Sequence, residues 1–210
     1  GFVMLGLVVL NAQGVEGSVI QMVNHGLSTG ALFLIVGMIY DRRHTRLITD
    51  FGGISKSMPI FASFFMIVTL SSIGLPGLNG FVGEFLILLG TFKKSTGLAV
   101  LAASGVILAA VYMLWMFKRA MFGPLDKEEN KSLKDLNLRE IAVLVPIIVM
   151  IVWIGIYPQT FLRKMDRSVE GFLARAGQNA APAIQPLERE SIFMTESNSA
   201  QDFWGQGHGN

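Results

Sequence analysis

GLPGLNG, residues 74–80, interrupts a long apolar segment that runs from residue 59 to residue 92. One membrane-spanning helix needs only about 20 residues, so the segment is too long for one continuous span and too short for two. Proline lacks a backbone donor and glycine favours non-helical backbone, so the segment should form one helix broken near the membrane midplane. The residues predicted to form or flank this break are Gly74, Pro76, Gly77, Asn79, Gly80 and Gly83.

Such a break restricts where the segment can lie. Unwound backbone at membrane depth must be buried in protein or line a hydrated cavity, because lipid offers it no hydrogen-bond partner. Broken helices of this kind mark ion-binding sites in transporters. The sequence therefore predicts a polar site inside the membrane, next to residues 74–80.

The composition supports a membrane protein. The chain is 51% hydrophobic and 15% charged, whereas soluble domains carry about 25% charged residues. The net charge of +2 is small, and no basic face with interleaved aromatic residues suggests a nucleic-acid partner. The absence of cysteine excludes disulfides, iron–sulfur clusters and thiolate metal sites in this chain.

The apolar runs predict an all-α, polytopic transmembrane helix bundle over residues 1–160. Because the chain opens within an apolar run without an initiator methionine, we interpret residues 1–11 as part of a span. The expected elements are a partial span at 1–11, spans at 16–40, 98–117 and 138–157, a broken span at 59–92, an amphipathic surface helix at 161–176 and a disordered polar tail at 177–210.

The basic residues predict how the bundle is oriented. The loops at 41–58 and 118–139 lie on the same side of the bundle and together carry ten Lys and Arg residues. Loops rich in Lys and Arg stay on the side from which the protein is inserted. We therefore expect these loops on the cytoplasmic or matrix side, and the C-terminal tail on the other.

Glu84 is the first candidate for chemistry. It is the only carboxylic acid that lies well inside a predicted span. An ionised carboxylate at membrane depth costs several kcal/mol, so such residues are usually functional. We interpret Glu84 as a group that takes up and releases a proton. The alternative is a structural carboxylate that caps the broken helix, because an acid near a helix start is favoured by the helix dipole.

His25 is the second candidate, and it lies inside the span at 16–40. Histidine titrates near neutral pH and can relay a proton through either ring nitrogen. Ser28 and Thr29, one turn further along the helix, have hydroxyls that can hold water. A relay and a purely structural histidine are equally compatible with these residues.

Ser71, Ser72 and Tyr112 complete the polar candidates within the spans. The two serines, with Asn79, flank the break. Satisfying the freed backbone groups is their simpler role, and direct ion binding or lining a water channel are the alternatives. For Tyr112 we weigh a hydrogen bond to channel water against a tyrosine packed in the core, and favour the core. No P-loop, dinucleotide-binding glycine motif or zinc-protease motif is present, so we expect no cofactor in this chain.

The sequences NHGLSTGALFL at 24–34, YDRRHTR at 40–46 and GLPGLNGFVGEF at 74–85 resemble the chain M family of respiratory NADH:quinone oxidoreductase (complex I), known in mitochondria as NADH dehydrogenase subunit four. The resemblance covers roughly residues 1–165. It implies a proton-translocating subunit built from two inverted repeats, of which this chain holds the C-terminal one.

The resemblance also implies roles for individual residues. Glu84 occupies the broken-helix position of a proton-exchanging glutamate, where related antiporter-like chains carry lysine, and His25 lies on the family's central polar axis. The glutamate and lysines of the first repeat would precede Gly1. NADH, FMN, iron–sulfur clusters and quinone would bind to other subunits, and the partners would be membrane-arm subunits, lipid and protons.

Two other functions remain open from the sequence. One is a subunit of a multi-subunit cation/proton antiporter, which has a similar helical plan and no redox partner. The other is a purely structural membrane subunit, which would need neither Glu84 nor His25.

Overall fold

The computed structural model describes residues 1–180, and this part of the chain is helical and contains no β-strand. Residues 1–173 form one compact unit, and residues 174–210 belong to a second. The elements are α1 (Phe2–Val9), α2 (Ala12–Arg43), the 3₁₀ helix η1 (Ile48–Asp50), α3 (Ile54–Ser57), α4 (Pro59–Ser72), α5 (Asn79–Lys94), α6 (Thr96–Met121), α7 (Glu128–Lys131), α8 (Leu138–Ile156) and α9 (Gln159–Ala180).

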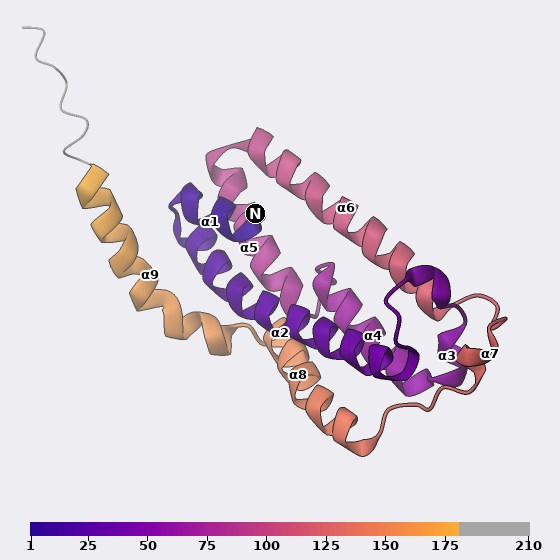
Figure 1. The fold of residues 1–210 in the computed structure, drawn as a ribbon. Coiled ribbons are helices and arrows are strands. Elements are labelled where there is room, and N and C mark those ends of the chain that lie inside the picture. The colour runs from indigo at the N-terminus through magenta and orange to yellow at the C-terminus, as the bar shows by residue number, and fades with distance from the viewer. Residues whose placement is uncertain (181–210) are drawn as a thin grey trace, which may run out of the picture. The chain divides into compact units, whose positions relative to one another are not determined.

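Three of these helices are long and apolar enough to cross a membrane, namely α2, α6 and α8. Helices α4 and α5 have 14 and 16 residues. At 1.5 Å per residue each is shorter than the roughly 30 Å hydrocarbon core. Figure 1 shows α4 and α5 following one another between α2 and α6. The predicted all-α transmembrane bundle with one discontinuous helix is confirmed.

The break between α4 and α5 has two parts. First, Gly74 ends α4 with φ 73°, and the amides of Gly74 and Leu75 bond back to the carbonyls of Ser71 and Leu70. These are the two hydrogen bonds of a Schellman motif, in which glycine takes the left-handed position. Next, the Leu78 amide bonds to the Leu75 carbonyl at 3.1 Å. Pro76 and Gly77 lie between Leu75 and Leu78, at the second and third positions of this turn. Proline followed by glycine is the residue order of a type II turn, and Gly77 has the positive φ, 93°, that its third position requires.

Several helix ends differ from the predicted spans because capping residues set them. Asn11 caps α2, since its side chain accepts a hydrogen bond from the Gly14 amide at 2.8 Å. The helix therefore begins at Ala12, where the span was predicted to begin at residue 16. It also continues through Arg43 and ends at His44, whose φ of 52° is left-handed.

The connecting segments contain short helices that the sequence did not suggest. The loop at 41–58 includes η1 and α3, and the loop at 118–139 includes α7. Helix α9 runs from Gln159 to Ala180, so it contains the stretch predicted as a helix at 161–176 and the first residues of the predicted tail. The rest of that tail, residues 181–210, lies outside the described residues.

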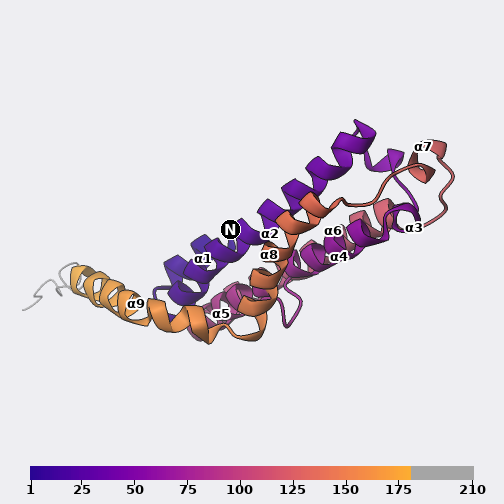
Figure 2. The same cartoon turned by 90° about the horizontal axis from the view of Figure 1, so that it is seen from below.

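Close packing holds the broken helix against its neighbours. Helices α2 and α5 form the most extensive helix pair in the described part of the chain. A Cβ added to Gly17 on α2 would lie 2.8 Å from the Ile87 amide nitrogen of α5, so only glycine allows this approach. Figure 2 shows α8 beside α2, and α8 also packs on α5. A Cβ at Gly155 of α8 would collide with the Gly77 carbonyl in the break.

A buried ion pair joins the ends of α2 and α8. The Arg42 guanidinium donates two hydrogen bonds to the Glu140 carboxylate, at 2.8 and 2.7 Å. Glu140 also completes a capping box with Asn137 at the start of α8. The Asp135 carboxylate accepts from the amides of the first turn of α4, at 2.8 and 3.0 Å. These contacts hold one end of the bundle together, and none of them involves the polar residues at mid-span.

Candidate functional site

A polar cavity of about 180 Å³ lies beside the break, between α2, α4, α5 and α6. Its walls carry most of the side chains that the sequence singled out, although these come from four helices. The lining residues are Gln21, Asn24, His25, Ser28, Thr29, Leu32, Ser71, Ser72, Gly80, Glu84, Tyr112 and Met113.

Glu84 is the one carboxylic acid on this cavity. It is partly buried and lies in the second turn of α5. A Cβ added to Gly74 would collide with the Glu84 carboxylate, so the carboxylate is seated against the left-handed glycine that ends α4. Within the described part of the chain, Glu84 forms no ion pair.

The capping interpretation of Glu84 is not supported by its position. The first turn of α5 contains no acid, and the residue before the helix, Leu78, makes no side-chain cap. The effect of a helix dipole falls off beyond the first turn. Its carboxylate lies against Gly74 at the end of the preceding half-helix.

A chain of hydrogen bonds connects α2 with both halves of the broken helix. The Ser28 and Ser71 hydroxyls are 2.7 Å apart, and the Ser71 hydroxyl donates to the Asn79 side-chain oxygen at 2.5 Å. The Asn24 amide donates to the Asn79 carbonyl at 2.6 Å. Ser71 and Asn79 thus join α4 to α5 across the break and to α2, whereas Ser72 only bonds back to the Val68 carbonyl within α4.

Asn24 and Gln21 are the site residues that the sequence analysis missed. Asn24 is 1% exposed, and its side-chain oxygen has no partner among the described residues. Gln21 lies against α5, because a Cβ added to Gly83 would collide with the Gln21 side chain. An amide side chain within an apolar span was the available signal, since a buried polar group there needs a partner.

His25, Thr29 and Tyr112 lie at the outer wall of the cavity. His25 is on the exposed side of α2 in this chain, and Thr29 is partly buried. Tyr112 is 60% exposed in this chain, so the described residues do not pack it as a core tyrosine. Helix α6 places this residue on the cavity wall.

Among the remaining break residues, only Gly80 lines the cavity. Pro76 and Gly77 are exposed in the turn, although the Gly77 carbonyl lies against Gly155 of α8, and Gly74 lies against the Glu84 carboxylate. Gly80 packs so closely on the Ser71 carbonyl that a Cβ could not fit. The break therefore has a polar side that holds the site and another side that α8 covers.

These features define a multi-pass membrane protein in which a broken helix borders a polar cavity containing a carboxylic acid. Residues 1–122 match the family described as NADH:quinone oxidoreductase/Mrp antiporter, TM. Because this match covers more than half of the chain, the chain belongs to that family, and the resemblance drawn from its sequence is confirmed.

Individual relatives come from bacteria and from a plant. The chain is 49% identical over 158 residues to NADH-quinone oxidoreductase subunit M of Rhodobacter capsulatus, covering 75% of this chain and 31% of the relative. It is 45% identical over 172 residues to NADH-ubiquinone oxidoreductase chain 4 of Marchantia polymorpha, covering 82% of this chain and 35% of that one.

A solved structure shares the fold. A chain of respiratory complex I from Thermus thermophilus with bound NADH superposes with a TM-score of 0.77 and 34% identity, covering 82% of this chain and 36% of that chain. The chain thus spans about a third of the length of the relatives that it matches.

Proposed function

We propose that this chain belongs to a proton-translocating membrane subunit of NADH:quinone oxidoreductase, and that Glu84 is the group that takes up and releases the proton. The observation that carries the proposal is the cavity, which gathers His25, Glu84 and several hydroxyls beside a helix break. A purely structural bundle has no need to collect these groups around one space.

The chemistry follows from the surroundings of the Glu84 carboxyl. Ionising an acid at the centre of a membrane helix costs about 2.5–3.5 kcal/mol on insertion scales. The neutral form is therefore held until water or a cation stabilises the anion. The break supplies polar groups on one side of the carboxyl, and Ser28 and Ser71 supply hydroxyls nearby. Such a group can exchange a proton with a hydrated path at modest cost.

His25 would deliver protons to this cavity or remove them. Either ring nitrogen can carry the transferred proton, and the exposed side of α2 gives the imidazole access from outside the cavity. Thr29 and Tyr112 offer hydroxyls at the same wall. We infer a path that enters at His25, follows the hydroxyls and ends at Glu84.

The same proposal places the redox cofactors and the quinone on other chains of the enzyme. This chain would be a non-redox subunit of the enzyme, with NADH, FMN, iron–sulfur clusters and quinone bound elsewhere, and other membrane-arm subunits and lipid around it. The loops at 41–58 and 118–139 would face the cytoplasm or matrix, because they carry ten Lys and Arg residues.

The second candidate function is a subunit of a cation/proton antiporter. It is supported by the family description, which names both the oxidoreductase and an antiporter. The two differ in what drives transport. An antiporter exchanges protons for sodium with no electron donor present, whereas the oxidoreductase subunit moves protons only during NADH oxidation.

The test is proton uptake into vesicles that hold the assembled enzyme carrying Glu84→Gln, measured during NADH oxidation. We expect most pumping to be lost with normal assembly, a smaller loss for Glu84→Asp, which keeps the carboxyl, and a partial loss for His25→Ala. Glu128→Gln, which changes an exposed loop acid, is the matched control. Normal pumping in assembled Glu84→Gln enzyme would refute the proposal, and sodium-driven proton exchange without NADH would favour the antiporter.

A further inference from the structure

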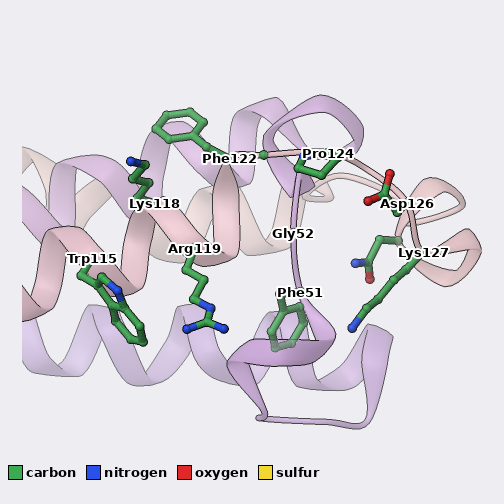
Figure 3. Close-up of a pocket in the computed structure, with 11 residues that line it drawn as sticks. Phe51, Gly52, Trp115, Lys118, Arg119, Phe122, Pro124, Asp126 and Lys127 are labelled. Atoms are coloured by element: carbon green, nitrogen blue, oxygen red, sulfur yellow. The ribbon is translucent and has the colours of Figure 1, made fainter.

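A second, larger cavity of about 520 Å³ lies far along α6 from Glu84, and it shares no lining residue with the site described above. It lies between the last two turns of α6, the segment that follows α6 and residues 51 and 52 (Figure 3). Helix α6 has 26 residues and is therefore about 39 Å long, more than the roughly 30 Å hydrocarbon core. The last turn of α6 then lies at the level of the lipid headgroups.

Three cations line this cavity, and two of them are unpaired. The side chains of Lys118 and Arg119, in the last turn of α6, form no ion pair or hydrogen bond with another described residue. The Lys127 ammonium lies 3.7 Å from the Asp50 carboxylate and donates to the Thr49 carbonyl. The Arg119 guanidinium lies 5.1 Å from the centre of the Trp115 ring, which fixes its position. Figure 3 shows Arg119 and Lys127 extending to the same side of α6, on either side of the Phe51 ring.

The cavity also offers hydrogen-bond acceptors. Asn130 is fully buried, and its amide donates to the Asp50 carbonyl at 3.1 Å. That bond leaves the Asn130 side-chain oxygen in the cavity wall without a partner among the described residues. Asp126 adds an exposed carboxylate to the same cavity. A ligand that fits must therefore carry negative charge for the cations and a donor for Asn130.

An apolar space adjoins the charged one. Phe51 lines both this cavity and a second cavity of about 180 Å³, whose walls include Ile35, Phe61, Phe65 and Met116. Trp115, which is 53% exposed, forms an aromatic edge at the depth where tryptophan favours the membrane interface. Charge, a buried acceptor and an apolar pocket thus occur together at headgroup level.

We propose that this cavity binds an anionic glycerophospholipid of the phosphatidylglycerol kind. Arg119 holds the phosphodiester, and Lys127, which keeps its Asp50 partner, adds a second positive charge beside it. Asn130 accepts a hydrogen bond from a headgroup hydroxyl, and the start of an acyl chain lies along Trp115 and Phe51. An acidic segment of a neighbouring protein would satisfy the cations, but it would leave the apolar cavity beside Phe51 without an occupant. Lipid is the ligand that a membrane-spanning chain meets at this depth.

The experiment uses the purified chain in phosphatidylcholine nanodiscs that contain a small share of photoreactive phosphatidylglycerol, with the adducts mapped by mass spectrometry. The adducts should lie within residues 115–130. Arg119→Gln should lower their yield about fivefold, which corresponds to roughly 1 kcal/mol for one cation near an anionic membrane surface. Arg119→Lys should keep most of the yield, and Arg139→Gln, an equal charge change at an exposed position on the same side of the bundle, should not alter it.

Competition provides a measurement that needs no variant. Unlabelled phosphatidylglycerol should remove the adducts, whereas phosphatidylcholine and inorganic phosphate should not. Equal yields in Arg119→Gln and Arg139→Gln would overturn the proposal, as would displacement by inorganic phosphate alone. Adducts in nanodiscs but none in native membranes would also overturn it, because a protein segment would then fill the cavity.

Discussion

Replacing Gly74 with alanine tests two features of this residue, its left-handed backbone and its contact with the Glu84 carboxylate. Gly74 adopts φ 73°, which an L side chain rarely does, and it lies against the Glu84 carboxylate. The left-handed conformation costs a non-glycine residue about 1–2 kcal/mol. A methyl group at position 74 would meet only the carboxylate end of the flexible Glu84 side chain, which can turn aside at about 0.5–1.5 kcal/mol, the cost of an off-rotamer side chain. Gly74→Ala should therefore reduce the free energy of unfolding by about 1.5–3.5 kcal/mol.

Gly77→Ala is the matched control, because Gly77 also has a positive φ, of 93°, but a Cβ there would meet no atom within 4 Å. It should cost only the conformational part, about 1–2 kcal/mol. In a Glu84→Ala background the collision at position 74 disappears, so Gly74→Ala should then cost no more than Gly77→Ala.

Equilibrium unfolding in mixed detergent micelles, followed by tryptophan fluorescence, measures all of these variants on one scale. We expect a coupling free energy of about 0.5–1.5 kcal/mol between positions 74 and 84 and none between positions 77 and 84. If Gly74→Ala and Gly77→Ala had equal effects in both backgrounds, the Glu84 carboxylate would not be seated against Gly74, and the geometry proposed for the site would be wrong.

Two further predictions concern contacts that the sequence did not reveal. Arg42→Met should destabilise the chain by about 3–5 kcal/mol, because it leaves the mostly buried Glu140 carboxylate without its partner. Adding Glu140→Met should recover only part of that loss in the same unfolding assay, because the double variant also lacks the capping box of α8 and the hydrogen bonds from Arg42 to nearby carbonyls. No recovery in the double variant would contradict this. Asn24→Leu should cost about 1–3 kcal/mol, because the 2.6 Å hydrogen bond to the Asn79 carbonyl is lost. An unchanged midpoint would show that this bond does not hold the break.

The helix break and its carboxylic acid could be predicted because their signals are local. Glycine and proline act on their own backbone, so residues 74–80 identify the interruption without any tertiary information. The rarity of acids in spans likewise identifies Glu84. Partners could not be predicted in this way, since Asn24 and Asn79 are 55 positions apart and meet only when α2 packs on α5.

Tyr112 shows a second limit of the sequence. Helix α6 is apolar on nearly all sides, so its sequence does not indicate which side faces the core. A tyrosine in such a helix looks the same whether it is packed or exposed. Only the placement of α6 against α5 and α4 shows that this residue lies on the wall of the cavity.

The protonation of the carboxyl group at position 84 can be observed by infrared difference spectroscopy of the assembled enzyme, started by adding NADH. Our account predicts a protonated-carboxyl band that changes during turnover, shifts in deuterium oxide, is missing in Glu84→Gln and is retained in Glu128→Gln. An unaltered band in Glu84→Gln would show that the exchanged proton binds elsewhere.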